Sequence, residues 1–334
     1  MIGWYVHSQG AGHLQRLAAV SRHLRTPVTA FGSATPPEGF AGKWIRLEHD
    51  DDGPVDRASA TADGALHWAP LHHPGLQHRH AAIAAWIARA RPSLFVTDVS
   101  VEVTALARLC GVPVVVFAML GDRDDPAHRL GRSLATALVA PWPPTRDRPD
   151  DGPRDDAGPP VLHVGAFSRF DGRTPPAEPS RPGTVLVLFG GGGRDVSDAD
   201  FRAARTATPG WTWEYRVPGS AEDAGSGKDV WTALHRAEVV VVHGGHNAVA
   251  EVAAARRPAV VIAQDRPFAE QRRRAELLRA EGLVALDRWP AAPEWPGLLD
   301  RARAAGAGAW ERWAPGDGAQ RAAAFLDDAA GERA

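Results

Sequence analysis

Short apolar runs rich in β-branched residues alternate with longer amphipathic stretches along the chain, and this alternation restricts the fold more than any other feature. It is typical of repeated β-α units around a parallel sheet. After a first strand near residues 3–8, apolar positions recur at helical spacing, which gives the next segment one buried face. Further strands are expected at 27–31, 93–98, 112–118, 161–167, 184–189, 211–217, 237–245, 258–263 and 283–286. The sequence therefore predicts an α/β protein.

A change of composition divides this α/β pattern into two parts. Between residues 140 and 183 the chain is dense in Pro, Asp, Arg and Gly, which cannot continue helices or central strands. A length of 334 residues also suits two domains. We expect one domain over residues 1–165 and a second over 166–318, with a last helical segment, 319–330, that can pack back on the first. Two such domains imply a cleft, with ligands beyond the carboxyl ends of the strands.

Composition excludes several partners. Lys and Arg number 38 against 40 Asp and Glu, a net charge of -2, so no nucleic-acid partner is expected. No apolar window approaches the ~18 residues that span a bilayer. Without a secretion signal, we expect a cytoplasmic protein whose membrane contact is at most peripheral. The single cysteine, Cys110, lies in an apolar stretch and is expected to be a buried structural thiol.

The most informative stretch is 239–271. A buried strand ends at His243, Gly244 and Gly245 permit a tight turn, and a helix starts near His246. Backbone N–H groups at a helix start form an anion site suited to phosphate. Glu251 follows a little over one turn into the helix, where its carboxylate can accept two hydrogen bonds from a ribose diol.

Other segments of this half can complete a nucleotide-sugar site. Glu270 and Gln271 follow the strand 258–263 and can bind sugar hydroxyls. A glycine run that includes Gly191 precedes Arg194, whose guanidinium suits a diphosphate, although a flexible turn with a solvated arginine is the alternative. Trp231 is either a base contact or a core residue.

Together these residues resemble the GT-B glycosyltransferases. The run from His243 through Asn247 to Glu251 is similar to the plant-type donor signature H-C-G-W-N-S-x-x-E, and Glu270-Gln271 to its D/E-Q end. It is also similar to the turn, helix and glutamate of the bacterial N-acetylglucosaminyltransferase that makes the peptidoglycan precursor. The resemblance implies two Rossmann-like domains, diphosphate contacts from His243 and Asn247, ribose contacts from Glu251 and sugar contacts from Glu270 and Gln271. The serine of the signature is Ala248 here, a loss that Arg194 can offset.

A second match lies in the first domain. The segment from Gly10 to Arg16 resembles the G-x-G-H-x-x-R opening of bacterial GT-B enzymes, which implies that Gly12 and Arg16 face the donor phosphates. His13 lies in the first helical turn, where the helix dipole favours a neutral ring that can act as a general base. Phosphate or acceptor contact and helix capping are the alternatives for His13, and a surface charge is the alternative for Arg16.

Carboxylates gather near the end of the strand 93–98. Asp98 either contributes to catalysis, by orienting His13 or binding the acceptor, or caps the following helix, in which Glu102 lies. A group of histidines is expected on a loop-rich acceptor surface rather than at a metal, because it lacks a pair at helix-face spacing. These are His67, His72, His73, His78 and His80.

The expected reaction moves a sugar from a nucleoside diphosphate sugar, by default a UDP-sugar, to an acceptor hydroxyl. The resemblance implies inversion, and the sequence predicts neither a cofactor nor a divalent metal at the diphosphate. The acceptor is a small natural product, a polysaccharide or a lipid-linked sugar. A sugar-nucleotide epimerase or hydrolase on the same fold, and a catalytically idle binding protein, are the alternatives. A nicotinamide enzyme is disfavoured because Gln15 replaces the third glycine of a dinucleotide fingerprint.

Overall fold

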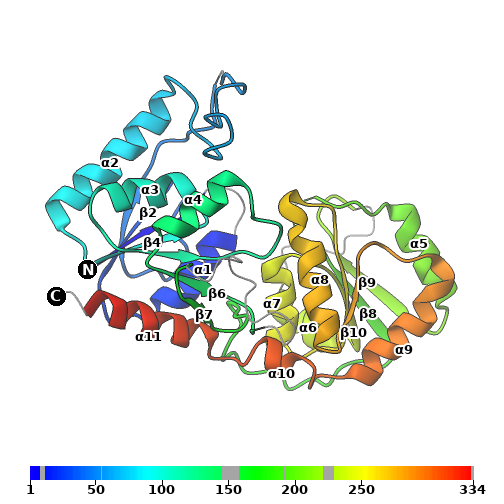
Figure 1. Cartoon of the computed structure of the whole chain (residues 1–334). Coiled ribbons are helices and arrows are strands. Elements are labelled where there is room, and N and C mark those ends of the chain that lie inside the picture. The colour runs from blue at the N-terminus through cyan, green and yellow to red at the C-terminus, as the bar shows by residue number, and fades with distance from the viewer. Residues whose placement is uncertain (8–11, 54, 145–157, 191–192, 221–228, 332–334) are drawn as a thin grey trace. The chain divides into compact units, whose positions relative to one another are not determined.

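The computed structural model describes residues 1–7, 12–53, 55–144, 158–190, 193–220 and 229–331. The chain divides into two compact α/β units (Figure 1). Unit 1 comprises residues 1–119, 123–164 and 318–334, and unit 2 comprises residues 120–122 and 165–317. The predicted α/β fold class is confirmed, since each unit is built on a parallel sheet.

Unit 1 contains a parallel sheet of seven strands in the order β3-β2-β1-β4-β5-β6-β7. The strands are β1 (Ile2–Tyr5), β2 (Val28–Gly32), β3 (Lys43–Arg46), β4 (Leu94–Asp98), β5 (Val114–Phe117), β6 (Ala137–Ala140) and β7 (Val161–His163). The helices are α1 (Gly12–Ser21), α2 (Pro74–Ala90), α3 (Val101–Leu109), α4 (Pro126–Leu134) and α11 (Gly318–Gly331).

Aromatic side chains fill the core on one face of this sheet. Phe31 stacks on Phe95 at 5.9 Å between ring centroids, and Trp86 of α2 meets Phe31 edge-on at 5.1 Å. A Cβ on Gly3 would lie 2.6 Å from the Phe95 ring and 2.8 Å from Trp86, so only glycine lets β1 pass beneath these rings. This packing anchors α2 on the sheet.

Unit 2 contains a parallel sheet of five strands in the order β12-β11-β10-β8-β9. The strands are β8 (Thr184–Leu188), β9 (Thr212–Arg216), β10 (Val239–His243), β11 (Ala259–Ile262) and β12 (Val284–Leu286). The helices are α5 (Asp198–Ala207), α6 (Val230–Arg236), α7 (His246–Ala254), α8 (Glu270–Ala280), α9 (Trp295–Ala305) and α10 (Trp310–Trp313), with 3-10 turns at Pro267–Ala269 and Ala292–Glu294.

Each sheet reverses its winding direction at one place. In unit 1 the chain runs outward from β1 through β2 to β3 and then returns to place β4 on the other side of β1. In unit 2 it runs from β8 to β9 and returns to place β10 on the other side of β8. The connections at such a point diverge and leave a crevice at the carboxyl ends of the two central strands, where ligands of open α/β sheets bind.

The last helix, α11, belongs to unit 1 although unit 2 precedes it in the chain. It packs on α1, and the Asp327 carboxylate accepts the backbone N–H groups of Arg25 at 3.0 Å and Thr26 at 2.9 Å. Asp327 thereby satisfies two donors just beyond the end of α1.

Several sequence expectations were wrong in detail. Cys110 is exposed, because it follows the last residue of α3 as its C-cap, and the buried positions of that helix end at Ala107. The segment around His78 and His80 is the helix α2 and not a loop, with Pro74 in its first turn and the Nδ1 of His73 accepting the Leu76 N–H. The strands β3 and β6 were not predicted, and the strand expected over 161–167 ends at His163. Among the described helices, none is both long and apolar enough to cross a membrane.

Candidate active site

At the reversal point of unit 1, Asp98 at the end of β4 contacts two side chains of α1. Its Oδ2 lies 2.9 Å from the Nδ1 of His13, and its Oδ1 accepts a charged hydrogen bond from Arg16. Strand β4 pairs directly with β1, whose chain leads into α1, so the sheet order itself brings these three residues together. His13 keeps 13% of its side chain exposed, while Asp98 is fully buried.

Asp98 is a charged residue inside the protein. Burial by itself raises the pKa of its carboxyl. The Arg16 guanidinium and the His13 ring lower the pKa by more than that, and the result is a pKa of about 2. Asp98 is therefore ionised at neutral pH. Capping was the alternative for this residue, and it is wrong, because Ser100 caps α3 by accepting the Val103 N–H.

This arrangement sets the chemistry available to His13. A carboxylate facing Nδ1 favours the tautomer that carries its proton there, which leaves the lone pair of Nε2 to accept a proton. Arg16 is 5% exposed, pairs with Asp98 and lies over the Phe117 ring, so the surface-charge alternative is wrong. Phosphate contact by Arg16 stays a prediction. Gly12 begins α1 directly beside His13.

At the reversal point of unit 2, His243 folds back over the turn that follows β10. Its Nδ1 accepts the Gly245 N–H at 3.0 Å. A Cβ on Gly245 would lie 2.3 Å from the His243 ring, so only glycine permits this turn. Burial, reinforced by Arg266 and Arg274, lowers the pKa of His243 to about 4. The ring is neutral at physiological pH, and because Nδ1 accepts a hydrogen bond, Nε2 carries the proton.

The proton on Nε2 points toward the loop after β8. The His243 Nε2 lies 3.3 Å from the position that a Cβ would take on Gly190, so the backbone at Gly190 approaches the histidine closely. Helix α7 begins here with Gly245 as its cap, which supplies no side-chain acceptor to the first turn. His246 and Asn247 lie in that turn. A neutral N–H donor and a helix start that follow the carboxyl end of one strand favour anion binding.

Glu251 lies inside α7 and is 8% exposed. Its Oε1 accepts a hydrogen bond from the Arg169 Nε at 2.8 Å. Burial raises the pKa of the Glu251 carboxyl, and Arg169 partly offsets that rise. Sequence reasoning missed Arg169, because it lies 82 residues away in a segment without a recognisable motif.

Glu270 and Gln271 support the turn after β10 from the start of α8. Arg274, which sequence reasoning also missed, donates to the Gly244 carbonyl and to the Glu270 carboxylate, the latter at 2.8 Å. The Gln271 Oε1 accepts the Gln264 N–H at 3.0 Å. The i, i+4 spacing of Glu270 and Arg274 is a pattern that could have indicated this pair. Sugar contact by Glu270 and Gln271 stays a prediction.

The remaining predicted donor residues are placed as follows. Arg194 forms an ion pair with Asp198 of α5 and lies over the Phe201 ring. Trp231 is 3% exposed, donates its indole N–H to the Thr174 carbonyl and packs on Phe170, which is the position of a core residue. Gly191 lies outside the described residues.

Comparison with known proteins identifies the fold. No protein-family model and no curated protein sequence matches the chain. Among solved structures, it is similar to UGT71G1 of Medicago truncatula complexed with UDP-glucose, with a TM-score of 0.67 and 15% identity over 99% of this chain and 98% of that one. It is similar to MurG of Acinetobacter baumannii, with a TM-score of 0.65 and 13% identity over 98% and 99% of the two chains.

A third similar structure is the glycosyltransferase of kitacinnamycin, with a TM-score of 0.65 and 16% identity over 98% of each chain. All three are GT-B glycosyltransferases, and the two parallel-sheet units of this chain are consistent with that fold. The chain therefore has the GT-B fold, as the sequence predicted.

Proposed function

We propose that this protein is a nucleotide-sugar glycosyltransferase that moves a sugar, from UDP by preference, to a hydroxyl-bearing acceptor. The observation that carries the proposal is that the predicted catalytic and donor-binding motifs lie where ligands of open α/β sheets bind. The two predicted motifs, around His13 and around His243, occupy the reversal points of their two sheets. The near-complete coverage of glycosyltransferase structures supports the same assignment.

In the proposed mechanism, His13 accepts the proton of the acceptor hydroxyl on Nε2 while Asp98 holds the ring through Nδ1. The acceptor oxygen then forms a bond to the anomeric carbon. The bond from that carbon to the diphosphate oxygen breaks, and the nucleoside diphosphate leaves with the electron pair. Displacement from the opposite face inverts the anomeric centre.

The leaving diphosphate is stabilised by fixed donors in unit 2. His243 offers its Nε2 proton, α7 offers the positive end of its dipole, and Arg194 supplies a cation when its pairing with Asp198 yields to the diphosphate. Fixed donors aimed at developing charge are the usual largest contribution to catalysis of this kind. We propose that these groups replace the divalent metal that would otherwise neutralise the diphosphate.

The ribose is assigned to Glu251. A carboxylate has two oxygens and about four lone-pair positions, of which Arg169 uses one. The remaining positions suit a vicinal diol. A cytoplasmic location, a small natural product, polysaccharide or lipid-linked acceptor, and membrane contact that is at most peripheral complete the proposal.

Donor binding is tested by thermal-shift titration with UDP, dTDP, GDP and NADH. Binding at 100 times the dissociation constant stabilises the folded protein by about 2.7 kcal/mol. We expect one nucleoside diphosphate to raise the melting temperature of wild type and of Glu276→Gln, an exposed carboxylate in the same unit, but not of Glu251→Gln. A response to NADH alone would overturn the donor-site assignment.

Catalysis is tested by His13→Gln. We expect a loss of about 10²- to 10⁴-fold in release of UDP from UDP-glucose with a panel of hydroxyl acceptors, and unchanged binding of UDP. A binding protein without activity would show no turnover to lose. An epimerase or hydrolase would release or convert the sugar without dependence on any acceptor.

A further inference from the structure

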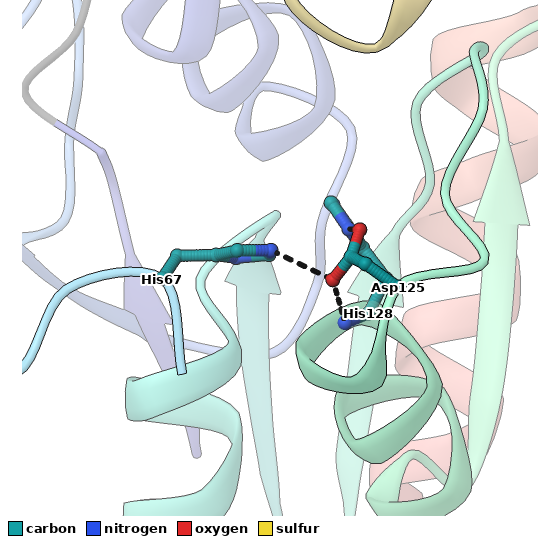
Figure 2. Close-up of side chains that lie close together, drawn as sticks. All are labelled: His67, Asp125 and His128. Atoms are coloured by element: carbon teal, nitrogen blue, oxygen red, sulfur yellow. Dashed lines mark hydrogen bonds and ion pairs between the residues drawn. The ribbon is translucent and has the colours of Figure 1, made fainter. Parts of the chain in front are cut away.

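His67, Asp125 and His128 lie together in unit 1 (Figure 2). The His67 Nε2 lies 3.3 Å from the Asp125 Oδ1, and the His128 Nδ1 contacts the Asp125 Oδ2. Figure 2 shows both imidazole rings directed at the one carboxylate, His67 from a loop and the other two from the start of α4. One ligand atom from each residue lies within 4.8 Å of the others.

The loop that carries His67 is held by hydrogen bonds that do not involve its imidazole ring. The Glu102 Oε1 accepts the backbone N–H groups of His67 at 2.8 Å and of Trp68 at 3.0 Å. The Trp68 indole donates to the Asp50 carbonyl at 2.8 Å. The His67 ring is therefore presented to α4 by a fixed backbone.

The other two groups are fixed by a helix start. Asp125 caps α4 by accepting the His128 N–H at 3.0 Å, and Pro126 occupies the first turn. The three side chains keep 31%, 33% and 8% of their surface exposed, for His67, Asp125 and His128 respectively, so an ion can reach them from solvent.

We propose that His67, Asp125 and His128 bind a divalent first-row transition cation, with Zn²⁺ as the best fit. Two imidazole nitrogens and one carboxylate oxygen are a common ligand set for such ions, and solvent completes the coordination. Ligands at about 2.1 Å from a tetrahedral ion lie about 3.4 Å from one another. The His67 and Asp125 atoms already meet that spacing, and a ligand atom of His128 lies within 4.8 Å of both.

One cation in the structure opposes this binding. The Arg123 Nη1 lies 2.7 Å from the His128 Nε2. Zn²⁺ on Nδ1 places a proton on Nε2, so the guanidinium has to turn away when the ion binds. Removing this charge should lower the dissociation constant for Zn²⁺ by about tenfold. The repulsion between a divalent and a univalent cation about 5 Å apart in water changes a binding constant by about that factor.

The site joins the loop at His67 to the start of α4, segments that are 58 residues apart. A bound ion therefore links these two segments within unit 1. It takes no part in the proposed sugar transfer, and its test does not depend on that function.

Equilibrium dialysis of the full chain against Zn²⁺, with metal analysis and a thermal-shift assay, tests the proposal. We expect one Zn²⁺ per chain and a raised melting temperature for wild type. We expect His67→Ala and His128→Ala to weaken binding on the order of 100-fold, and Arg123→Gln to strengthen it. His67 is part exposed, so His67→Ala keeps the test valid if His128→Ala fails to fold.

Two controls separate this site from other histidines. His78 pairs with Glu48 on the exposed side of α2, and His49 lies beside Asp51 and Asp52 in an exposed cluster. Neither His78→Ala nor His49→Ala should change Zn²⁺ binding. Loss of the bound ion in His49→Ala, retention of it in His67→Ala, or tighter binding of Mg²⁺ than of Zn²⁺ would overturn the proposal.

Discussion

At the scale of single residues, the His243 turn shows how one ring can fix both a backbone and a protonation state. The ring accepts the Gly245 N–H, occupies the space where any other residue would place its Cβ, and is neutral because burial and two arginines oppose its charge. The same ring consequently carries a proton on Nε2. Substitution of His243 should therefore change how stability depends on pH, and substitution of Gly245 should change ligand binding.

The low pKa of His243 predicts a pH-dependent stability. The folded pKa is about 4 against 6.5 for the unfolded chain, so the unfolded state binds more protons between these values. The contribution of this ring to the free energy of unfolding is full above pH 6.5 and is lost as the pH drops toward 4, by about 3 kcal/mol in total. His243→Asn, which keeps an acceptor near Nδ1, should lack this dependence. Melting temperatures of both proteins measured from pH 7.5 to 4 check it, and parallel curves would contradict it.

Gly245→Ala should abolish nucleoside diphosphate binding. The new Cβ would lie 2.3 Å from the His243 ring and would force the ring or the turn to move. Gly297→Ala is the matched control, because a Cβ there meets only a side-chain atom at 3.6 Å and the site is in a helix. Alanine in a helix stabilises by about 0.5–1 kcal/mol relative to glycine. A UDP titration in which both variants respond like wild type would refute the role of the turn.

At the scale of elements, the positions of the reversal points decide which loops carry chemistry. β1 and β4 are paired neighbours, as are β8 and β10, so loops distant in sequence meet at their carboxyl ends. Asp98 reaches His13 and Gly190 reaches His243 for this reason. The helix α11 is a comparable case, because its Asp327 completes the end of α1 although about 300 residues separate them.

Asp327→Ala should destabilise unit 1 by about 2 kcal/mol, since it leaves two backbone donors in partly buried hydrogen bonds without their charged acceptor. Asp328→Ala is the control, because Asp328 is 74% exposed and lies 3.9 Å from an exposed Arg25. Such surface pairs contribute little. Urea denaturation gives the free energies of unfolding, and hydrogen exchange at Arg25 and Thr26 locates the effect. Equal losses in the two variants would contradict this assignment.

At the scale of the whole molecule, the two units have separate cores and separate reversal points. The proposed diphosphate and ribose groups all lie in unit 2, whereas His13 and Asp98 lie in unit 1. In the proposed mechanism, the donor-binding groups and the general base therefore come from different units. A nucleoside diphosphate without a sugar should bind to the diphosphate and ribose groups of unit 2.

Hydrogen exchange of the full chain with saturating UDP tests this division. Protection should appear at the turn after β10 and at the start of α7 in wild type, and it should be absent in Glu251→Gln. The exchange of the buried β2 and β4 amides should not change. Protection that spares the β10 turn in wild type would contradict the assignment of the donor to unit 2.

The sequence by itself determined the periodic α/β pattern, the GT-B fold and the candidate motifs at His13, His243 and Glu251. The α/β pattern and the motifs follow from local signals, because β-branched runs, glycine turns and helix starts act within a few residues. The GT-B fold was implied by the resemblance of those motifs to known glycosyltransferases. Local signals also misled. The apolar stretch around Cys110 concealed an exposed thiol, and His78 and His80, which were expected on a loop, lie inside the helix α2.

Only the tertiary structure decided the partners of these residues. Arg16 and His13 converge on Asp98, Arg169 reaches Glu251, and His67 meets His128, although each pair except His13 and Arg16 is separated by 61 to 85 residues. Sheet order brings such residues together, and sheet order depends on which strands share a core rather than on any local pattern. Ion pairing and burial, which set the charge of Asp98 and His243, follow from that arrangement.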